Sequence, residues 1–163
     1  MKWEEYEALK NQLESFVDEI RLKVAVVDAH HEPVTNAAES VRQDLLTVRE
    51  LSTTVECRRT DLERLQQIGN VLAETASEGR QMALRSETAA LTDAIVELTE
   101  MLNRLISRLE ALDQRWSELS TQNSELRTLL SEKQETLQQT LRDTSLTLDQ
   151  QYAAVKVRAV SFW

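Results

Sequence analysis

The most constraining feature of this sequence is an unbroken seven-residue repeat that extends from Leu91 to Leu130. Its inward positions are spaced alternately by four and three residues, and all but one of them are apolar. These positions are Leu91, Ile95, Leu98, Leu102, Leu105, Leu109, Leu112, Trp116, Leu119, Asn123, Leu126 and Leu130. The spacing predicts a narrow apolar seam along one side of a long α-helix. Because such a seam packs against other helices, we expect the chain to act through helix–helix contacts.

Composition favours an all-α fold. The 163 residues include two glycines and one proline, too few for the turns of a sheet protein or for looped active-site walls. Aromatic residues make up only 4%, so the bulky side chains that fill a compact single core are scarce. The length suits one domain built from long helices, each with one face exposed to water.

Charge and hydropathy restrict the expected partners. With 28 acidic and 19 basic side chains the net charge is −9, which argues against general binding to nucleic acid or to anionic lipid. No apolar run approaches the ~20 residues needed to span a bilayer, and the N-terminus has no signal-peptide pattern. Cys57 is the single cysteine, so no disulfide forms within the chain. We therefore expect a cytoplasmic protein whose partners are proteins.

Three helices are expected. They cover residues 3–27, 37–76 and 86 to about 155. Pro33 separates the first helix from the second, and Asn36 with Glu39 resembles a capping box at the start of the second. Residues 76–79 form the second turn, with Gly79 as a left-handed cap. The alternative is a helix that continues through Gly79, at a cost of only ~1 kcal/mol.

The first two helices also carry apolar residues at spacings of three and four. In the first helix the inward residues are Trp3, Tyr6, Leu9, Leu13, Phe16, Ile20, Val24 and Val27. In the second they are Val41, Leu45, Val48, Val55, Leu62, Leu65, Ile68 and Leu72. Ser52 and Arg59 interrupt this second seam. Trp3, Leu13, Phe16 and Ile20 are expected to be buried.

The width of the apolar stripe divides the third helix. Ala94, Met101 and Ile106 widen it, which suits a helix that touches two neighbours. After Arg108 the flanking residues turn polar, which suits a single partner helix. The predicted domains are an elongated antiparallel three-helix bundle over 3–110, with its third helix over 86–110, and a projecting coiled-coil continuation over 111–160.

The continuation is the candidate protein-interaction site, because little of the chain remains to cover it. Its residues are Trp116, Leu119, Asn123, Leu126, Leu130, Leu137 and Leu141. Each large side chain left in water forfeits ~1.5–3 kcal/mol, so a seam of this length indicates an interaction surface. In a parallel homodimer Arg108 faces Asp113 of the second copy, and Asn123 fixes the register. Alternatively, Asn123 meets water where a neighbouring helix ends.

Several stretches resemble the helices of a spectrin repeat. Residues 109–119 are similar to the closing helix, with its Leu-x-x-Arg-Trp-x-x-Leu signature. Residues 48–51 and 65–72 resemble the middle helix, which often ends in Gly-x-x-Leu, and Trp3 takes the place of a first-helix tryptophan. The resemblance implies a cytoskeletal rod related to spectrin, dystrophin or α-actinin, with nesprins and spectraplakins favoured. Trp3 and Trp116 lie further apart than in a typical repeat, so a divergent repeat or parts of two adjoining repeats are expected.

No combination of residues indicates catalysis. Gly69 and Gly79 lie outside any phosphate-binding pattern. His30 and His31, in an acidic segment, are expected to be solvated and not to bind metal. Cys57 is expected to be an unreactive thiol on the outer face of its helix. We therefore expect no enzymatic activity, no cofactor and no bound metal.

Two functions are consistent with these observations. The favoured one is a structural rod or spacer segment of a cytoskeletal or scaffolding protein. The alternative is a dimeric coiled-coil adaptor that recruits a partner protein along the long third helix. The apolar C-terminal segment from Tyr152 to Trp163 is either a partner-binding tip or, as we favour, a surface that packs against a continuation of the chain.

Overall fold

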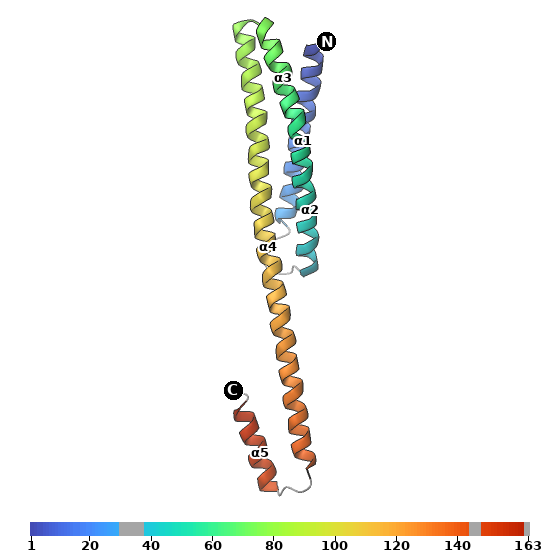
Figure 1. The fold of residues 1–163 in the computed structure, drawn as a ribbon, viewed down its shortest axis with the longest axis vertical. Coiled ribbons are helices and arrows are strands. Elements are labelled where there is room, and N and C mark those ends of the chain that lie inside the picture. The colour runs from blue at the N-terminus through green and yellow to red at the C-terminus, as the bar shows by residue number, and fades with distance from the viewer. Residues whose placement is uncertain (30–37, 144–147, 162–163) are drawn as a thin grey trace. The chain divides into compact units, whose positions relative to one another are not determined.

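The chain is all-α. The computed structural model describes residues 1–29, 38–143 and 148–161, which contain five α-helices and no β-strand (Figure 1). The helices are α1 (Lys2–Ala29), α2 (Ala38–Cys57), α3 (Arg59–Thr75), α4 (Glu78–Arg142) and α5 (Leu148–Val160). Contacts divide the chain into two compact units, Met1–Gln114 and Arg115–Trp163. The division falls inside α4, so this helix contributes residues to both units.

In the first unit, α1 runs in the same direction as the N-terminal part of α4. The Nζ atom of Lys10 lies 3.4 Å from a carboxylate oxygen of Glu87. Further along both helices, Asp28 of α1 pairs with Arg108 of α4. Residue numbers therefore rise together along this pair of helices.

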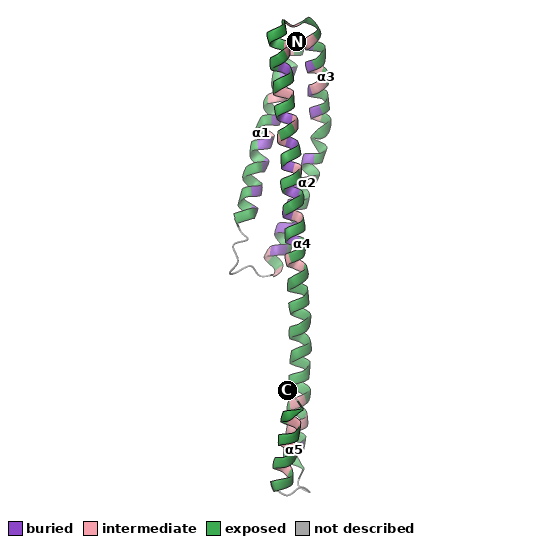
Figure 2. Cartoon of the chain, turned by 90° about the vertical axis from the view of Figure 1, so that its left-hand side faces the viewer, coloured by how far each residue is buried: buried purple, intermediate pink, exposed green. Residues whose placement is uncertain are grey.

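The other two helices of the first unit, α2 and α3, run in the opposite direction to α4. Arg42, near the start of α2, bonds Asp113 at 2.9 Å. Gln66, within α3, donates a hydrogen bond to the hydroxyl group of Thr92 at 3.1 Å. Both views in Figures 1 and 2 show α2 and α3 following one another along α4.

An apolar core fills the space between the helices of the first unit. Each helix turns one face inward, and buried residues recur along these faces (Figure 2). The buried apolar residues are Tyr6, Leu13, Val17, Ile20, Val24, Val27, Val41, Leu45, Val48, Leu51, Val55, Leu62, Leu65, Leu72, Leu84, Leu91, Ile95, Leu98, Leu102, Leu105 and Leu109. Because each large side chain contributes ~1.5–3 kcal/mol by burial, this core is the main source of stability.

On α1, Val17 is buried in the core, and Phe16 is not. Leu13 and Ile20 are buried as predicted, whereas Phe16 is only half-buried. The inward positions alternate strictly by four and three residues, and Val17 satisfies this alternation between Leu13 and Ile20. Phe16 instead gives two successive steps of four, to Ile20 and to Val24, so its ring falls on the flank of the helix.

Trp3, at the start of α1, is also less buried than predicted, because it lies at the edge of the core. The guanidinium group of Arg80 covers its ring, 4.6 Å from the centroid. The edge of the ring meets Tyr6, with the two centroids 6.4 Å apart. Trp3 therefore closes the end of the core and does not fill its interior.

The prediction of one continuous helix over 37–76 is wrong at Arg58, which separates α2 from α3. The backbone N–H of Arg58 bonds the carbonyl oxygen of Val55 at 3.1 Å, a tighter turn than the α-helix makes. Arg58 falls on the inward spacing between Val55 and Leu62, where a guanidinium group cannot be buried without a partner. The helix breaks at this residue, and the side chain turns outward.

The turn between α3 and α4 lies at Ala76 and Ser77, so α4 begins at Glu78 and not at residue 86. The side-chain amide of Gln81 donates a hydrogen bond to the carbonyl oxygen of Ala76 at 3.0 Å. Gly79 lies inside the first turn of α4, and among the described residues no glycine has a positive φ. Gly79 is therefore not the left-handed cap that the sequence predicts.

The second unit contains the C-terminal part of α4 and the whole of α5. A single helix to residue 155 is wrong, because α4 ends at Arg142 and α5 folds back beside it (Figure 1). Arg158 of α5 donates a hydrogen bond to the backbone carbonyl of Thr136 at 3.0 Å. Thr140 is 5% exposed and Leu141 is 62% exposed, so the inward spacing of α4 continues to Thr140, and Leu141 lies beside it.

Some predictions fall on residues outside the described ranges. They concern Pro33, the capping box that begins at Asn36, and the final Phe162 and Trp163. Across the described residues, none of the helices combines the length and apolar character needed to cross a membrane.

Candidate functional site

The central residues of the predicted interaction site lie in the second unit and are exposed. Leu119, Leu126 and Leu130 are 56%, 57% and 49% exposed. Trp116 and Asn123 are also exposed. The alternation of three and four residues puts all five on one side of α4, which we call the α4 face.

The same seam of α4 is closed in the first unit. Leu98, Leu102 and Leu109 are at most 1% exposed, because α1, α2 and α3 pack against them. One heptad pattern therefore supports two different environments along one helix. The spacing that identifies the α4 face cannot by itself distinguish a covered leucine from an exposed one.

The last two predicted interaction residues lie where α5 approaches α4. Leu137 is half-buried, and Leu141 is exposed. Together with Leu130, Arg158 and Ala159 they line a cavity of about 560 Å³. This cavity is mainly apolar and belongs to the second unit. Sequence reasoning missed it, because the α5 segment was expected to continue α4.

Two arginines border the α4 face. Arg115 immediately precedes Trp116, and Arg127 immediately follows Leu126, so they lie at opposite edges of the seam. Within the described residues, neither guanidinium group makes an ion pair with a carboxylate. The edges of the α4 face are therefore basic, although the chain has a net charge of −9.

In the first unit, ion pairs that join different helices border the covered seam. Arg108 pairs with Asp28 of α1, and Asp113 accepts a hydrogen bond from Arg42 of α2 at 2.9 Å. Arg108 and Asp113 were expected to pair between two copies of the chain. Both charges are instead used within one chain, so that expected contribution to a homodimer is lost.

A polar cluster that sequence reasoning missed lies between α1 and α4. The hydroxyl group of the fully buried Tyr6 donates a hydrogen bond to Glu87 at 3.2 Å, and Lys10 reaches the same oxygen at 3.4 Å. Burial raises the pKa of Tyr6. The pKa of Lys10 is also raised, first by its hydrogen bond with Glu7 and then by Glu87.

The spacing of Lys10 gave a signal for this cluster. Lys10 lies on the inward repeat of α1, four residues after Tyr6 and three before Leu13. A lysine at an inward position requires a carboxylate partner on the facing helix. The hydrogen bonds of the cluster join α1 to α4, so it contributes to the contact between these two helices.

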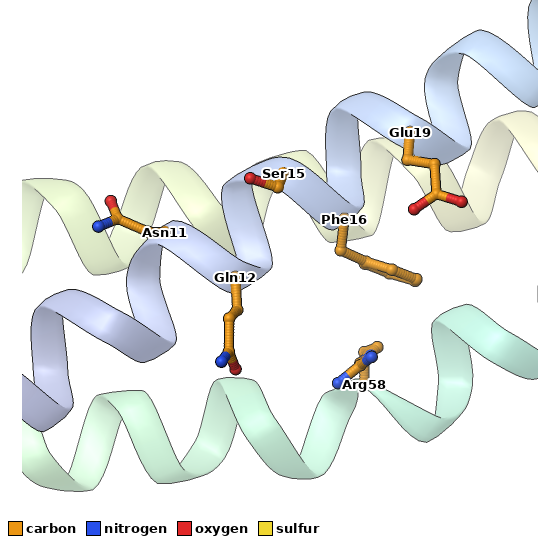
Figure 3. Close-up of a pocket in the computed structure, with 6 residues that line it drawn as sticks. All are labelled: Asn11, Gln12, Ser15, Phe16, Glu19 and Arg58. Carbon is orange, nitrogen blue, oxygen red and sulfur yellow. The ribbon is translucent and has the colours of Figure 1, made fainter.

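An open hollow of about 400 Å³ lies between α1 and the junction of α2 with α3 (Figure 3). Phe16 points into it from α1, and Arg58 faces Phe16 from the junction. The centre of the guanidinium group is 5.3 Å from the centroid of the ring. Gln12, Asn11, Ser15 and Glu19 complete the wall of this hollow.

The remaining candidates from the sequence give no site. Cys57 is exposed at the end of α2. His30 and His31 lie outside the described residues. Among the residues that the structure describes, no three side chains of the types that bind metals come together.

Comparison with known proteins gives no relative. The chain matches no protein-family model, no curated protein and no solved structure. A functional assignment therefore rests on the α4 face, the covered seam and the contacts between helices.

Proposed function

We propose that the chain is a non-enzymatic structural rod or spacer segment of a cytoskeletal or scaffolding protein, located in the cytoplasm. The observation that carries this proposal is the single seam of α4, which is covered at Leu109 and exposed at Leu119. A helix built in this way holds one set of helices together and offers a further surface to another. Such an arrangement supplies length and contact, and requires no reactive group.

The architecture that we propose is an elongated antiparallel three-helix bundle of the spectrin-repeat type, continued by a coiled-coil segment. The direction of α1 and the opposite direction of α2 and α3 support it, as does the strict spacing of the core. In this proposal α2 and α3 together form the middle helix, interrupted at Arg58. The exposure of Trp116 and the half-burial of Trp3 are departures from the repeat pattern, which fit a divergent member.

The contacts between helices suit a segment that keeps its length. The apolar core continues along α4 from Leu84 to Leu109. Ion pairs such as Arg64 with Glu5 and Arg49 with Glu110 connect neighbouring helices along its outside. Exposed pairs of this kind contribute only ~0–1 kcal/mol each. Burial of the apolar seam therefore supplies most of the free energy that holds the helices together. The ion pairs favour one alignment of the helices.

The alternative function is a dimeric coiled-coil adaptor that recruits a protein partner along α4. The exposure of Leu119, Leu126 and Leu130 on one side of the helix favours it. Asn123, at an inward position of the heptad, is the type of residue that fixes the register of a two-stranded coiled coil.

Sedimentation over a wide range of protein concentration distinguishes the two functions. A spacer remains monomeric, whereas an adaptor forms a dimer whose fraction rises with concentration. Replacing both Leu126 and Leu130 by glutamate abolishes such a dimer and leaves the helices of the first unit folded. The matched control replaces Leu22 and Leu46, which are 70% and 54% exposed in the first unit, by glutamate. Unfolding of the whole chain by the first pair, but not by the control pair, contradicts both proposals.

A further inference from the structure

We propose that the α4 face binds an amphipathic helix of another protein that carries carboxylates beside its own apolar seam. This inference rests on the proposed function, in which α4 offers a surface for a further helix. It adds the chemistry of the partner. Three features support it: the exposed apolar strip of the α4 face, the charge at the edges of this strip, and the pairing of arginines with acids between the other helices of the chain.

The apolar strip has the width of a contact for one helix. Trp116, Leu119, Leu126 and Leu130 follow one another along the helix at heptad positions, and Leu119 and Leu126 are more than half exposed. The positions beside them in the helix are polar or charged, except Leu129. A narrow strip bounded by polar residues is typical of a surface that meets a single helix.

The edges of the strip are basic. Arg115 and Arg127 lie beside the strip on its two sides, and neither is paired with a carboxylate within the described residues. Glu118 and Glu125 occupy outward positions of the heptad, further round the helix than its edge. Glu118 is three residues after Arg115 and is therefore its neighbour on the helix surface, but among the described residues no ion pair joins the two. Carboxylates on a docking helix therefore have two unpaired guanidinium groups available as partners.

The chain completes its covered seams in this way. Arg108 of α4 is paired with Asp28 of α1, and Arg64 of α3 is paired with Glu5 of α1. In both cases the neighbouring helix supplies the acid. Arg115 lies seven residues after Arg108 and so belongs to the same row of the heptad. The helix that covers the α4 face is expected to continue this pattern with an acid beside Arg115.

A second copy of this chain fits the face less well. In a parallel, in-register pair, each Arg115 faces Ser120 of the second copy, and each Arg127 faces Gln122. All of the edge arginines then remain without a carboxylate. The exposed strip is also only about two heptads long, which is short for a two-stranded coiled coil held by apolar contacts alone.

The test uses two synthetic amphipathic peptides of equal length, with leucine at the seam positions. One carries glutamate and the other lysine at every position beside the seam. Binding to the full chain is measured by calorimetry at low and at high salt. We expect the glutamate peptide to bind about tenfold tighter than the lysine peptide at low salt, with the difference reduced at high salt. Equal binding of the two peptides, or no binding of either, overturns the proposal.

The variants locate the effect. Replacing Arg115 and Arg127 together by glutamine removes the preference for the glutamate peptide. Replacing Arg85 and Arg104, two other exposed arginines of α4, leaves it unchanged. A preference that survives the first pair of substitutions overturns the proposal.

Failure of this proposal is distinguishable from failure of the proposed function. A chain that stays monomeric and binds neither peptide remains a spacer, but its α4 face has another role. A chain whose own dimerisation through Leu126 and Leu130 excludes both peptides assigns the face to a second copy, which overturns the acidic-helix proposal and favours the adaptor.

Discussion

The guanidinium group of Arg58 lies over the ring of Phe16, 5.3 Å from its centroid, where α2 ends and α3 begins. The same group pairs with Asp61 at 2.8 Å. Both contacts keep the side chain of Arg58 at the surface. Its spacing from Val55 and Leu62 would otherwise direct it into the core. The break between the two helices therefore has a local cause, a charged residue at an inward position.

Arg58→Leu is predicted to stabilise the chain and to join α2 to α3. A leucine at this position can enter the core, which is worth ~1.5–3 kcal/mol, while the lost stacking on Phe16 costs ~0.5–1 kcal/mol. We expect the free energy of unfolding in urea to rise by about 1 kcal/mol, with a small gain of helical circular dichroism. Arg59→Leu is the control. The side chain of Arg59 is 52% exposed, so this substitution should not raise the free energy of unfolding. A loss of stability in Arg58→Leu contradicts this account of the break.

Stability is predicted to fall at high pH because of the cluster around Glu87. Burial raises the pKa of Tyr6 above its ordinary value of 10.0. The pKa of Lys10 is raised above its ordinary value of 10.5, and the main cause is the hydrogen bond between Lys10 and Glu7. The unfolded chain therefore releases both protons at lower pH than the folded chain does. The contribution of these two groups to the free energy of unfolding should be constant below about pH 9 and should decrease as the pH rises above these ordinary values.

A pair of tyrosine variants checks the high-pH prediction. Tyr6→Phe removes one of the two titrating groups, so the decrease in the free energy of unfolding should become shallower. Tyr152→Phe should leave the pH profile unchanged, because Tyr152 is 71% exposed. Both are measured by urea unfolding at a series of pH values from neutral upward. Identical profiles for Tyr6→Phe and the parent chain exclude Tyr6 as a source of the pH dependence.

The all-α class and much of the core could be predicted from the sequence. The spacing of three and four residues identified the buried positions of α4 from Leu91 to Leu109, and those of the second predicted helix apart from the half-buried Ile68. These predictions succeed because burial of one face repeats regularly along a helix. The α4 face as an interaction site stays a prediction.

The differences between the predicted and the observed structure have local causes that the spacing of apolar residues does not reveal. A count of apolar residues accepts Phe16 as readily as Val17, and it places the interruption of the second seam at Arg59 and not at Arg58. The end of α4 at Arg142 and the fold-back of α5 depend on contacts such as that of Arg158 with Thr136. The Tyr6 cluster requires knowing that Glu87 faces α1, which only the pairing of the helices supplies.

Substitutions of two leucines in α4 should affect the free energy of unfolding differently, because one lies in the covered part of the seam and the other in the exposed part. Leu102 is 1% exposed and Leu119 is 56% exposed, although both occupy inward positions of the same heptad. Leu102→Ala should lower the free energy of unfolding by ~2–5 kcal/mol, because it leaves a cavity in the core. Leu119→Ala should change it by no more than ~0.5 kcal/mol in dilute solution. A large loss for Leu119→Ala would show that this part of the seam is covered in solution.

The two glycines are predicted to respond in opposite ways to a large side chain. Gly69 is buried in α3, and a Cβ atom placed there would lie 3.4 Å from the ring of Tyr6 and 3.7 Å from the hydroxyl oxygen of Thr88. Gly79 lies in the first turn of α4 with no atom within 4 Å of such a Cβ. An alanine fits at both positions, but a leucine fits only at Gly79.

Gly69→Leu should therefore lower the free energy of unfolding by ~1–3 kcal/mol, because the added atoms displace the fully buried Tyr6. Gly79→Leu should leave it unchanged or raise it by up to ~1 kcal/mol, because leucine is the better helix former and meets open solvent. Urea unfolding of the two variants beside the parent measures the difference. Equal effects of the two substitutions would contradict the close approach of α1 to α3 at Gly69, on which the position of Tyr6 beside Glu87 depends.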